Sequence, residues 1–241
     1  MWKLYDELIA GIPEEPEVSR LIIGKTWTAV LSSEGTVGLA MTTPVETVGR
    51  STQNFEGMSL RSAAEKVKSW NFIEAGIGMA AINAWYNSRR RLEDLGYAQG
   101  DTRFCTYDIP YEGKKLCMVG ALRYPKGMFD SAESLVVLER NIIEGTYPDS
   151  ACECFIPESD LVLITGSAFI NKTMPRLLEL GKNADLIITG PSAPMTDALL
   201  SHGVRRVAGL VITDEEGCLD FVASGEYGTP YRFGERYIVE A

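Results

Sequence analysis

Residues 160–203 contain nearly the same pattern twice. Asp-Leu-Val-Leu-Ile-Thr-Gly-Ser at 160–167 returns as Asp-Leu-Ile-Ile-Thr-Gly-Pro-Ser at 185–192, and a helix-like stretch ending in glycine follows each copy. The apolar runs do not alternate with polar residues, which is typical of strands buried on both faces of a parallel sheet. The repeat therefore predicts two consecutive strand–turn–helix units.

Three further apolar runs extend this pattern, at 115–122, 134–139 and 207–214. With helix-like segments between most of them, they predict a Rossmann-like α/β domain with a parallel sheet over residues 97–241. The first 96 residues differ, because a short helix precedes a hairpin of 27–33 and 36–43 around Glu34-Gly35, and helices are expected at 58–70 and 71–87. We expect residues 1–96 to form a smaller α+β module.

Charge and composition limit the partners. The net charge is −10 and the chain of 241 residues has 45% hydrophobic residues, which is ordinary for a globular protein. An acidic chain lacks the basic footprint needed for nucleic acid or anionic membranes, and no run approaches 18 apolar residues. We expect a cytoplasmic protein with reduced thiols, since the cysteine count of five is odd and no secretion signal is present.

The glycine turns mark the expected ligand edge. In open parallel sheets, ligands lie beyond the carboxyl ends of the strands, where Thr165, Gly166, Gly190, Pro191 and Ser192 fall. Glycine permits close backbone approach, and helix N-termini behind the turns suit an anion. The alternative is that these are ordinary turns between strands and helices.

A second part of the same edge follows the strands at 115–122 and 134–139. Gly120 and Glu139 have a spacing that resembles a dinucleotide site, but the turn lacks the G-x-G-x-x-G pattern, so classical NAD binding is not expected. Arg123 could neutralise a bound anion or form a surface ion pair.

Cys152 and Cys154 form a metal-binding candidate, because thiolates bind soft metals. A strong zinc signature needs a second pair, so a structural role is the main alternative. His202 is expected to end a helix just before Gly203, where it complements the helix dipole.

Five motifs spread along the chain carry a combined signal: SWNFIEAGIGMAAINA at 69–84, MVGALRYP at 118–125, VVLERN at 136–141, LITGSAFINKTMPRLLEL at 163–180 and TGPSAPMTDALLSHGVRRVAGLVITD at 189–214. Together they resemble the putative heavy-metal chelation domain family of bacteria and archaea. The resemblance covers nearly the whole chain. It implies an enolase N-terminal-like module before a Rossmann-like domain, with a cleft between them. The implied cleft residues are Asn83, Glu139, Arg140, Asn141, Thr165, Gly166, Asn171, Lys172, Thr173, Gly190, Pro191 and Ser192.

One departure from the family limits what the resemblance implies. Relatives often place histidine or a small residue before Phe-Pro after the MVG motif, where this chain has Ala121-Leu122-Arg123-Tyr124-Pro125. No histidine role is therefore carried over to this loop.

The predicted function is binding of a small anionic ligand or metal chelate in that cleft, by an enzyme of anaerobic, metal or cofactor metabolism or by a protein without catalysis. If the site is catalytic, Lys172 is the candidate electrostatic stabiliser and Glu139 the candidate acid or base. The alternatives are direct handling of a metal ion, which would then be the cofactor, and a non-catalytic regulatory subunit. A homodimer is compatible with an exposed sheet edge.

Overall fold

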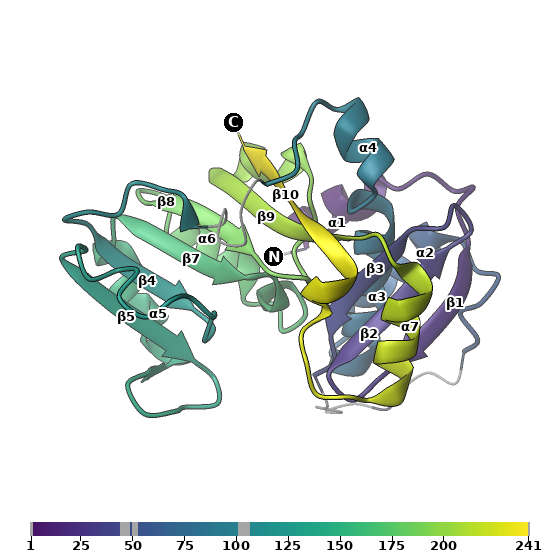
Figure 1. Cartoon of the computed structure of the whole chain (residues 1–241), viewed down its shortest axis with the longest axis horizontal. Helices are drawn as coiled ribbons and strands as arrows, with labels where there is room; N and C mark the ends of the chain where they lie inside the picture. Colours follow the sequence, from purple (N-terminus) through teal and green to yellow (C-terminus); the bar gives the residue numbers. More distant parts are fainter. Residues whose placement is uncertain (1, 44–48, 50–52, 101–106, 241) are drawn as a thin grey trace.

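The computed structural model describes residues 2–43, 49, 53–100 and 107–240 (Figure 1). Two sheets organise the chain. A three-stranded antiparallel sheet has the order β1-β2-β3, and a seven-stranded sheet has the order β10-β9-β8-β7-β4-β5-β6. In the described part of the chain, no helix has the length and apolar character needed to cross a membrane.

The N-terminal half builds the small sheet and its helices. Their bounds are α1 Lys3–Ala10, β1 Val18–Ile23, β2 Trp27–Ser32, β3 Val37–Met41, α2 Leu60–Ala64, α3 Phe72–Tyr86 and α4 Arg89–Asp94. The expected hairpin is β2–β3, and the helix expected at 58–70 is α2 continued by the 3-10 turn η1, Glu65–Lys68. Asn71 caps α3 by accepting the backbone N–H groups of Ile73 and Glu74.

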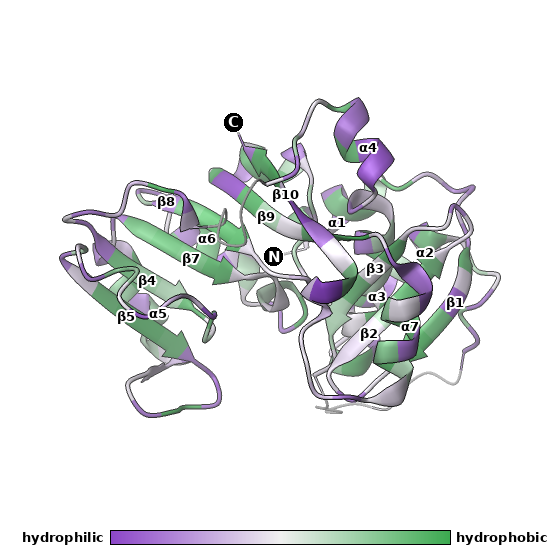
Figure 2. Ribbon diagram, viewed as in Figure 1, coloured by the Kyte–Doolittle hydropathy of each residue, from purple (hydrophilic) through white to green (hydrophobic). Residues whose placement is uncertain are grey.

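The seven-stranded sheet confirms the α/β fold expected from the apolar runs. Its strands are β4 Lys115–Val119, β5 Ser134–Glu139, β6 Tyr147–Pro148, β7 Leu161–Thr165, β8 Asp185–Thr189, β9 Val204–Ile212 and β10 Gly234–Glu240. All neighbours are parallel except β10, which returns antiparallel to β9. From β4 the chain builds first toward β6 and then from β7 toward β10, which is the doubly wound order. Figure 2 shows hydrophobic residues concentrated along β4, β5 and β7, whereas β10 has mixed polarity.

Short α-helices and 3-10 helices separate most of the strands of this sheet. The remaining segments are η3 Asp149–Ala151, α5 Cys152–Phe155, η4 Ile156–Glu158, η5 Gly166–Phe169, α6 Met174–Leu180, η6 Asp197–His202, α7 Glu215–Ser224 and η7 Pro230–Phe233. The connection from β4 to β5 contains no helix. Its aromatic side chains, with Tyr107, Ile109 and Tyr111 before β4, form the cluster that covers one face of the sheet.

The two halves share their core. Helix α3 packs on one face of the small sheet, through Val30 and Ala40, while α7 from the C-terminal half packs on the other, through Ala29 and Leu39 (Figure 1). The boundary predicted at residues 96–97 falls between α4 and β4, in a stretch that returns to the large sheet, because Gly100 N–H bonds the carbonyl of Arg236.

Candidate functional site

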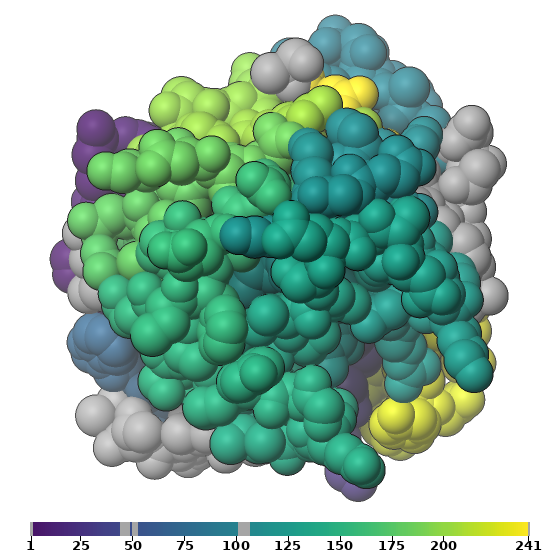
Figure 3. Space-filling model, turned by 90° about the vertical axis from the view of Figure 1, so that its left-hand side faces the viewer, coloured from purple at the N-terminus to yellow at the C-terminus, as the bar shows by residue number. Residues whose placement is uncertain are grey.

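A cavity of about 1320 Å³ lies between the two halves. Its walls come from the carboxyl ends of β4, β5, β7 and β8, from residues 41–43 after β3, and from residues 229–236 near the C-terminus. Figure 3 looks onto the half that contributes most of these walls, drawn in teal and green, with the yellow C-terminal residues at one side. Strands β4 and β7 are neighbours whose connections run in opposite directions, and this switch point is where open α/β sheets bind ligands.

The glycine turns form part of this cavity. Gly120, Thr165, Gly190 and Pro191 line it, and Gly120 and Gly190 have φ angles of 93° and 107°. Gly166 lies behind the wall, because a Cβ there would be 2.4 Å from the backbone nitrogen of Ala193. The close approach that the sequence predicted is therefore between two protein turns at this position.

Ser192 also serves the protein itself. Its side chain is buried, and its Oγ accepts the N–H of Met41 at 2.9 Å, so it fastens the β8 turn to the end of β3. Asn83 acts in the same region. Its Nδ2 donates to the carbonyls of Leu39 at 2.7 Å and Pro191 at 3.5 Å, while its buried Oδ1 has no partner among the described residues. Neither side chain is part of the cavity lining.

Glu139 lines the cavity at the end of β5. Its carboxylate accepts three backbone N–H groups, from Ala121 at 2.8 Å, Arg140 at 2.8 Å and Asn141 at 3.3 Å. These bonds tie the loops after β4 and β5 together, so the shape of this part of the cavity depends on Glu139. An acid or base role for it stays a prediction.

Lys172 lies behind the cavity wall rather than in it. Only 6% of the residue is exposed, its φ is 69°, and its Nζ donates to the carbonyl of Ile170 at 2.6 Å and lies 5.5 Å from the centre of the Phe72 ring. Burial lowers the pKa of the ammonium to about 8. Its neighbours Asn171 and Thr173 line the cavity, with Asn171 Oδ1 accepting the hydroxyl of Thr173 at 2.6 Å.

Arginines give the cavity its charge. Five arginines and three carboxylates line it; they are Arg123, Arg140, Arg176, Arg232 and Arg236 with Glu139, Asp149 and Glu153. Three of the arginines are neutralised, Arg140 by Asp149, Arg176 by Glu153 and Glu179, and Arg232 by Glu226.

Arg123 and Arg236 differ from these three, because among the described residues no carboxylate lies within 4 Å of either guanidinium. The sequence pointed to Arg123 and Arg140, which follow predicted strands, but gave no signal for the arginines of α6 and the C-terminal segment.

Tyrosines form the wall beside these two arginines. Tyr107, Tyr124 and Tyr231 line the cavity, and the hydroxyl of Tyr107 donates to the carbonyl of Arg123 at 3.0 Å. Burial raises the pKa of Tyr107 to about 12. Of these three, only Tyr124 lies in a sequence motif, MVGALRYP at 118–125, whereas Tyr107 and Tyr231 lie in segments without a strand or motif signal.

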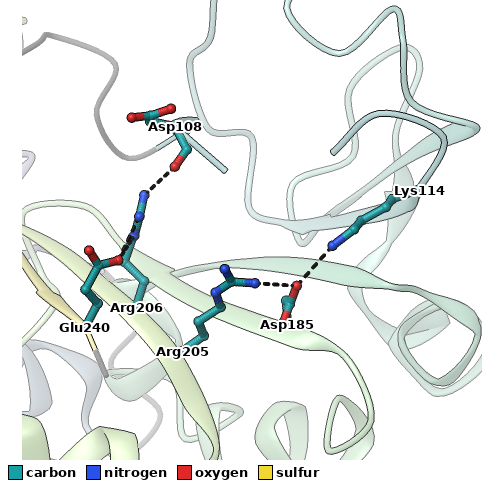
Figure 4. A network of polar contacts seen from close by, with 6 residues as sticks. All are labelled: Asp108, Lys114, Asp185, Arg205, Arg206 and Glu240. Carbon is teal, nitrogen blue, oxygen red and sulfur yellow. Dashed lines mark hydrogen bonds and ion pairs between the residues drawn. The ribbon is translucent and has the colours of Figure 1, made fainter. Parts of the chain in front are cut away.

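Ion pairs hold the segment around Tyr107 against the sheet (Figure 4). Arg206 on β9 donates to the carbonyl of Asp108 at 2.8 Å and pairs with Glu240. Asp185 at the start of β8 accepts from both Lys114 and Arg205, at 3.1 and 2.8 Å. These contacts fix residues 108–114 and thereby the tyrosine wall.

The donor set of the described residues does not fit a directly bound metal ion. No group of three or more His, Cys, Asp or Glu side chains gathers in residues 2–43, 49, 53–100 and 107–240. Cys152 lines the cavity, but burial raises the pKa of its thiol, and Cys154 is exposed and outside the cavity. His202 ends η6 as expected and contacts Glu7 at 2.5 Å. Cys105 lies outside the described residues.

Comparison with known proteins places the chain in a family. Residues 108–239 match the family described as "Putative heavy-metal chelation" (DUF364), and residues 5–86 match a second family with the same description (DUF4213). The chain therefore belongs to the putative heavy-metal chelation family, as its motifs suggested.

Solved structures of the DUF364 family agree with this assignment, and a curated relative is similar in sequence. A DUF364 protein of unknown function from Desulfitobacterium hafniense is 37% identical with a TM-score of 0.89, over 100% of this chain and 99% of that one. A second, from Pyrococcus horikoshii, is 26% identical with a TM-score of 0.80, over 99% and 98%. An uncharacterized protein of Methanocaldococcus jannaschii is 29% identical over 63% of this chain, and the match spans 60% of that relative's length.

Proposed function

We propose that this protein binds a small anionic ligand, including the chelate of a metal, in the cavity between its two halves. The observation that carries the proposal is the pair Arg123 and Arg236, which line the cavity with no carboxylate within 4 Å among the described residues. The other three lining arginines are neutralised by ion pairs. In a chain with a net charge of −10, guanidinium groups left without a counter-charge at a cavity wall attract and retain anions.

The nature of the donors favours a chelate over a bare metal ion. Arginine guanidinium groups recognise oxoanions and repel metal cations. The described side chains include no cluster of three metal-binding groups. A metal would therefore enter as cargo, with its charge already neutralised by an organic ligand. Direct metal handling by Cys152 and Cys154 is the less favoured alternative, because the two thiols do not share the cavity.

Native mass spectrometry of protein purified without chelators or metal-affinity resin tests the proposal. We expect an organic adduct, with or without a metal, that is retained when both Cys152 and Cys154 are changed to serine. A metal mass without an organic component, lost in the serine variant, would support direct metal handling. An adduct released equally by acidic and neutral competitors would also count against an anionic site.

A further inference from the structure

Arg236 has the surroundings of a ligand-binding arginine. It lies half-buried on β10, and its guanidinium carbon is 3.8 Å from the centre of the Tyr231 ring. Its backbone is fixed from both sides, by pairing with Leu210 and by the bond from Gly100 N–H. A stacked guanidinium keeps its N–H edge available for a planar oxoanion, and stacking limits the side-chain entropy lost on binding.

Arg123 contacts the same group of tyrosines. Its Nη2 donates to the hydroxyl of Tyr227 at 3.2 Å, and Tyr107 binds its backbone carbonyl. Burial raises the pKa of the Tyr107 phenol, and the positive charge of Arg236 partly offsets this rise, so the two side chains interact electrostatically. Tyr107 therefore connects the two arginines that have no carboxylate partner among the described residues.

The other parts of the cavity provide fewer available donors for an anion. Ser192 and Lys172 are committed to protein carbonyl and amide groups behind the wall. The segment that follows the β7 turn is η5, a 3-10 helix of four residues, which is too short to provide a helix N-terminal site. An anionic group thus finds its best partners at Arg123 and Arg236.

The wall beside these arginines is aromatic. Tyr107, Tyr124 and Phe129 pack edge to face, with ring centres 5.0 to 6.5 Å apart, and Tyr107 and Tyr124 line the cavity. Such a wall suits a flat ring, because aromatic pairs add to the energy gained from burial.

From these contacts we infer that Arg123, Arg236 and Tyr231 form the subsite for the acidic group of a planar aromatic carboxylate, whose ring packs against Tyr107 and Tyr124. The inference rests on the proposed function and names the ligand class. The subsite joins the loop after β4, which carries Arg123 and Tyr124, to the C-terminal segment, which carries Tyr231 and Arg236.

Pyridine-2,6-dicarboxylate is a suitable probe, because it is a flat aromatic diacid and a metal chelator. Its binding is measured by calorimetry on the full chain without metal, with the uncharged pyridine-2,6-dimethanol as a second probe. The variants are Arg236→Gln and Arg123→Gln. Arg232→Gln is the matched control, since Arg232 lines the same cavity but is paired with Glu226.

We expect the diacid to bind and the dimethanol not to bind. Arg236→Gln and Arg123→Gln each weaken binding about tenfold or more, since each removes a hydrogen bond to a charged group, whereas Arg232→Gln changes it less than about threefold. Arg123 is exposed, so Arg123→Gln keeps the test valid if Arg236→Gln does not fold.

Two results overturn the subsite. The first is equal binding of the diacid by wild type, Arg236→Gln and Arg123→Gln. The second is no detectable binding of the diacid by wild type at a ligand concentration of about 10 mM, which exceeds the dissociation constant of even a weak ligand. The proposed function is judged separately. An organic anion that co-purifies with wild type and with Arg236→Gln would leave that function standing while the subsite fails.

Discussion

The guanidinium carbon of Arg236 lies 3.8 Å from the centre of the Tyr231 ring, at the wall of a cavity that both residues line. The two residues belong to the C-terminal segment, which reaches the cavity only because β10 returns antiparallel along β9. This stack presents a charged group without a carboxylate partner among the described residues. It is the contact on which the ligand class depends.

Replacing Tyr231 tests whether the stack orients Arg236. We expect Tyr231→Leu to weaken binding of pyridine-2,6-dicarboxylate about fivefold, because a cation–π contact of this kind contributes about 1 kcal/mol. Tyr231→Phe keeps the ring and should bind within about twofold of wild type. Calorimetry on both variants decides the matter. Equal losses in the two would show that the hydroxyl, and not the stack, is what counts.

The lowered pKa of Lys172 should make the stability of the protein depend on pH in a specific way. Its pKa in the folded protein is about 8, below the ordinary value of 10.5, so the unfolded chain binds the proton more tightly. Stability must then rise as pH increases from about 8 toward 10.5, and this gain is absent at lower pH. Lys172→Met removes the titrating group and the effect with it.

The measurement is the free energy of unfolding in urea at pH 7 and pH 9, for wild type and Lys172→Met. We expect Lys172→Met to be the more stable at pH 7, and its advantage to shrink by about 1 kcal/mol at pH 9. Lys182→Met, at an exposed position, is the control. An advantage that does not change with pH would mean that the folded protein keeps the proton of Lys172 as tightly as the unfolded chain does, so that burial does not lower the pKa.

Two glycines of α3 give opposite predictions. A Cβ at Gly78 would be 2.0 Å from the backbone nitrogen of Val67, so Gly78→Ala should cost about 3 kcal/mol by forcing helix and turn apart. A Cβ at Gly76 would meet only Met41 O at 3.4 Å and Thr28 Oγ1 at 3.8 Å. Gly76→Ala should therefore stabilise by about 0.5 kcal/mol through helix propensity. Urea unfolding of both variants checks this, and a similar cost at the two positions would be inconsistent with the packing described.

The cysteine pair gives a prediction about metal content. Cys152→Ser with Cys154→Ser should leave the metal stoichiometry of purified protein unchanged, because the described residues supply no third ligand near either thiol. Elemental analysis by plasma mass spectrometry provides the measurement. A stoichiometric metal lost on this substitution would revive direct metal binding.

The strands of the large sheet were predictable because burial on both faces produces runs such as Leu161–Thr165 and Asp185–Thr189. Strand β10 escaped prediction because it is an edge strand of mixed polarity, and β6 because it has only two residues. The connection from β4 to β5 has no helix, and aromatic packing of this loop covers the sheet there.

Some residues of the candidate site could be predicted from the sequence and others could not. Topology alone brings Gly120, Glu139, Thr165 and Gly190 to the cavity, because each ends or directly follows a parallel strand. The side chain of Lys172 could not be placed from sequence, since its direction depends on a turn with positive φ. Arg236 and Tyr231 required knowledge of how the chain returns after α7.

The decisive experiment is a crystal structure of the protein grown with pyridine-2,6-dicarboxylate. We expect the diacid in the cavity between the two halves, with a carboxylate within hydrogen-bond distance of the guanidinium of Arg236 and the ring against Tyr107 and Tyr124. A diacid bound elsewhere, or a cavity that holds a metal ion on Cys152 in its place, would contradict it.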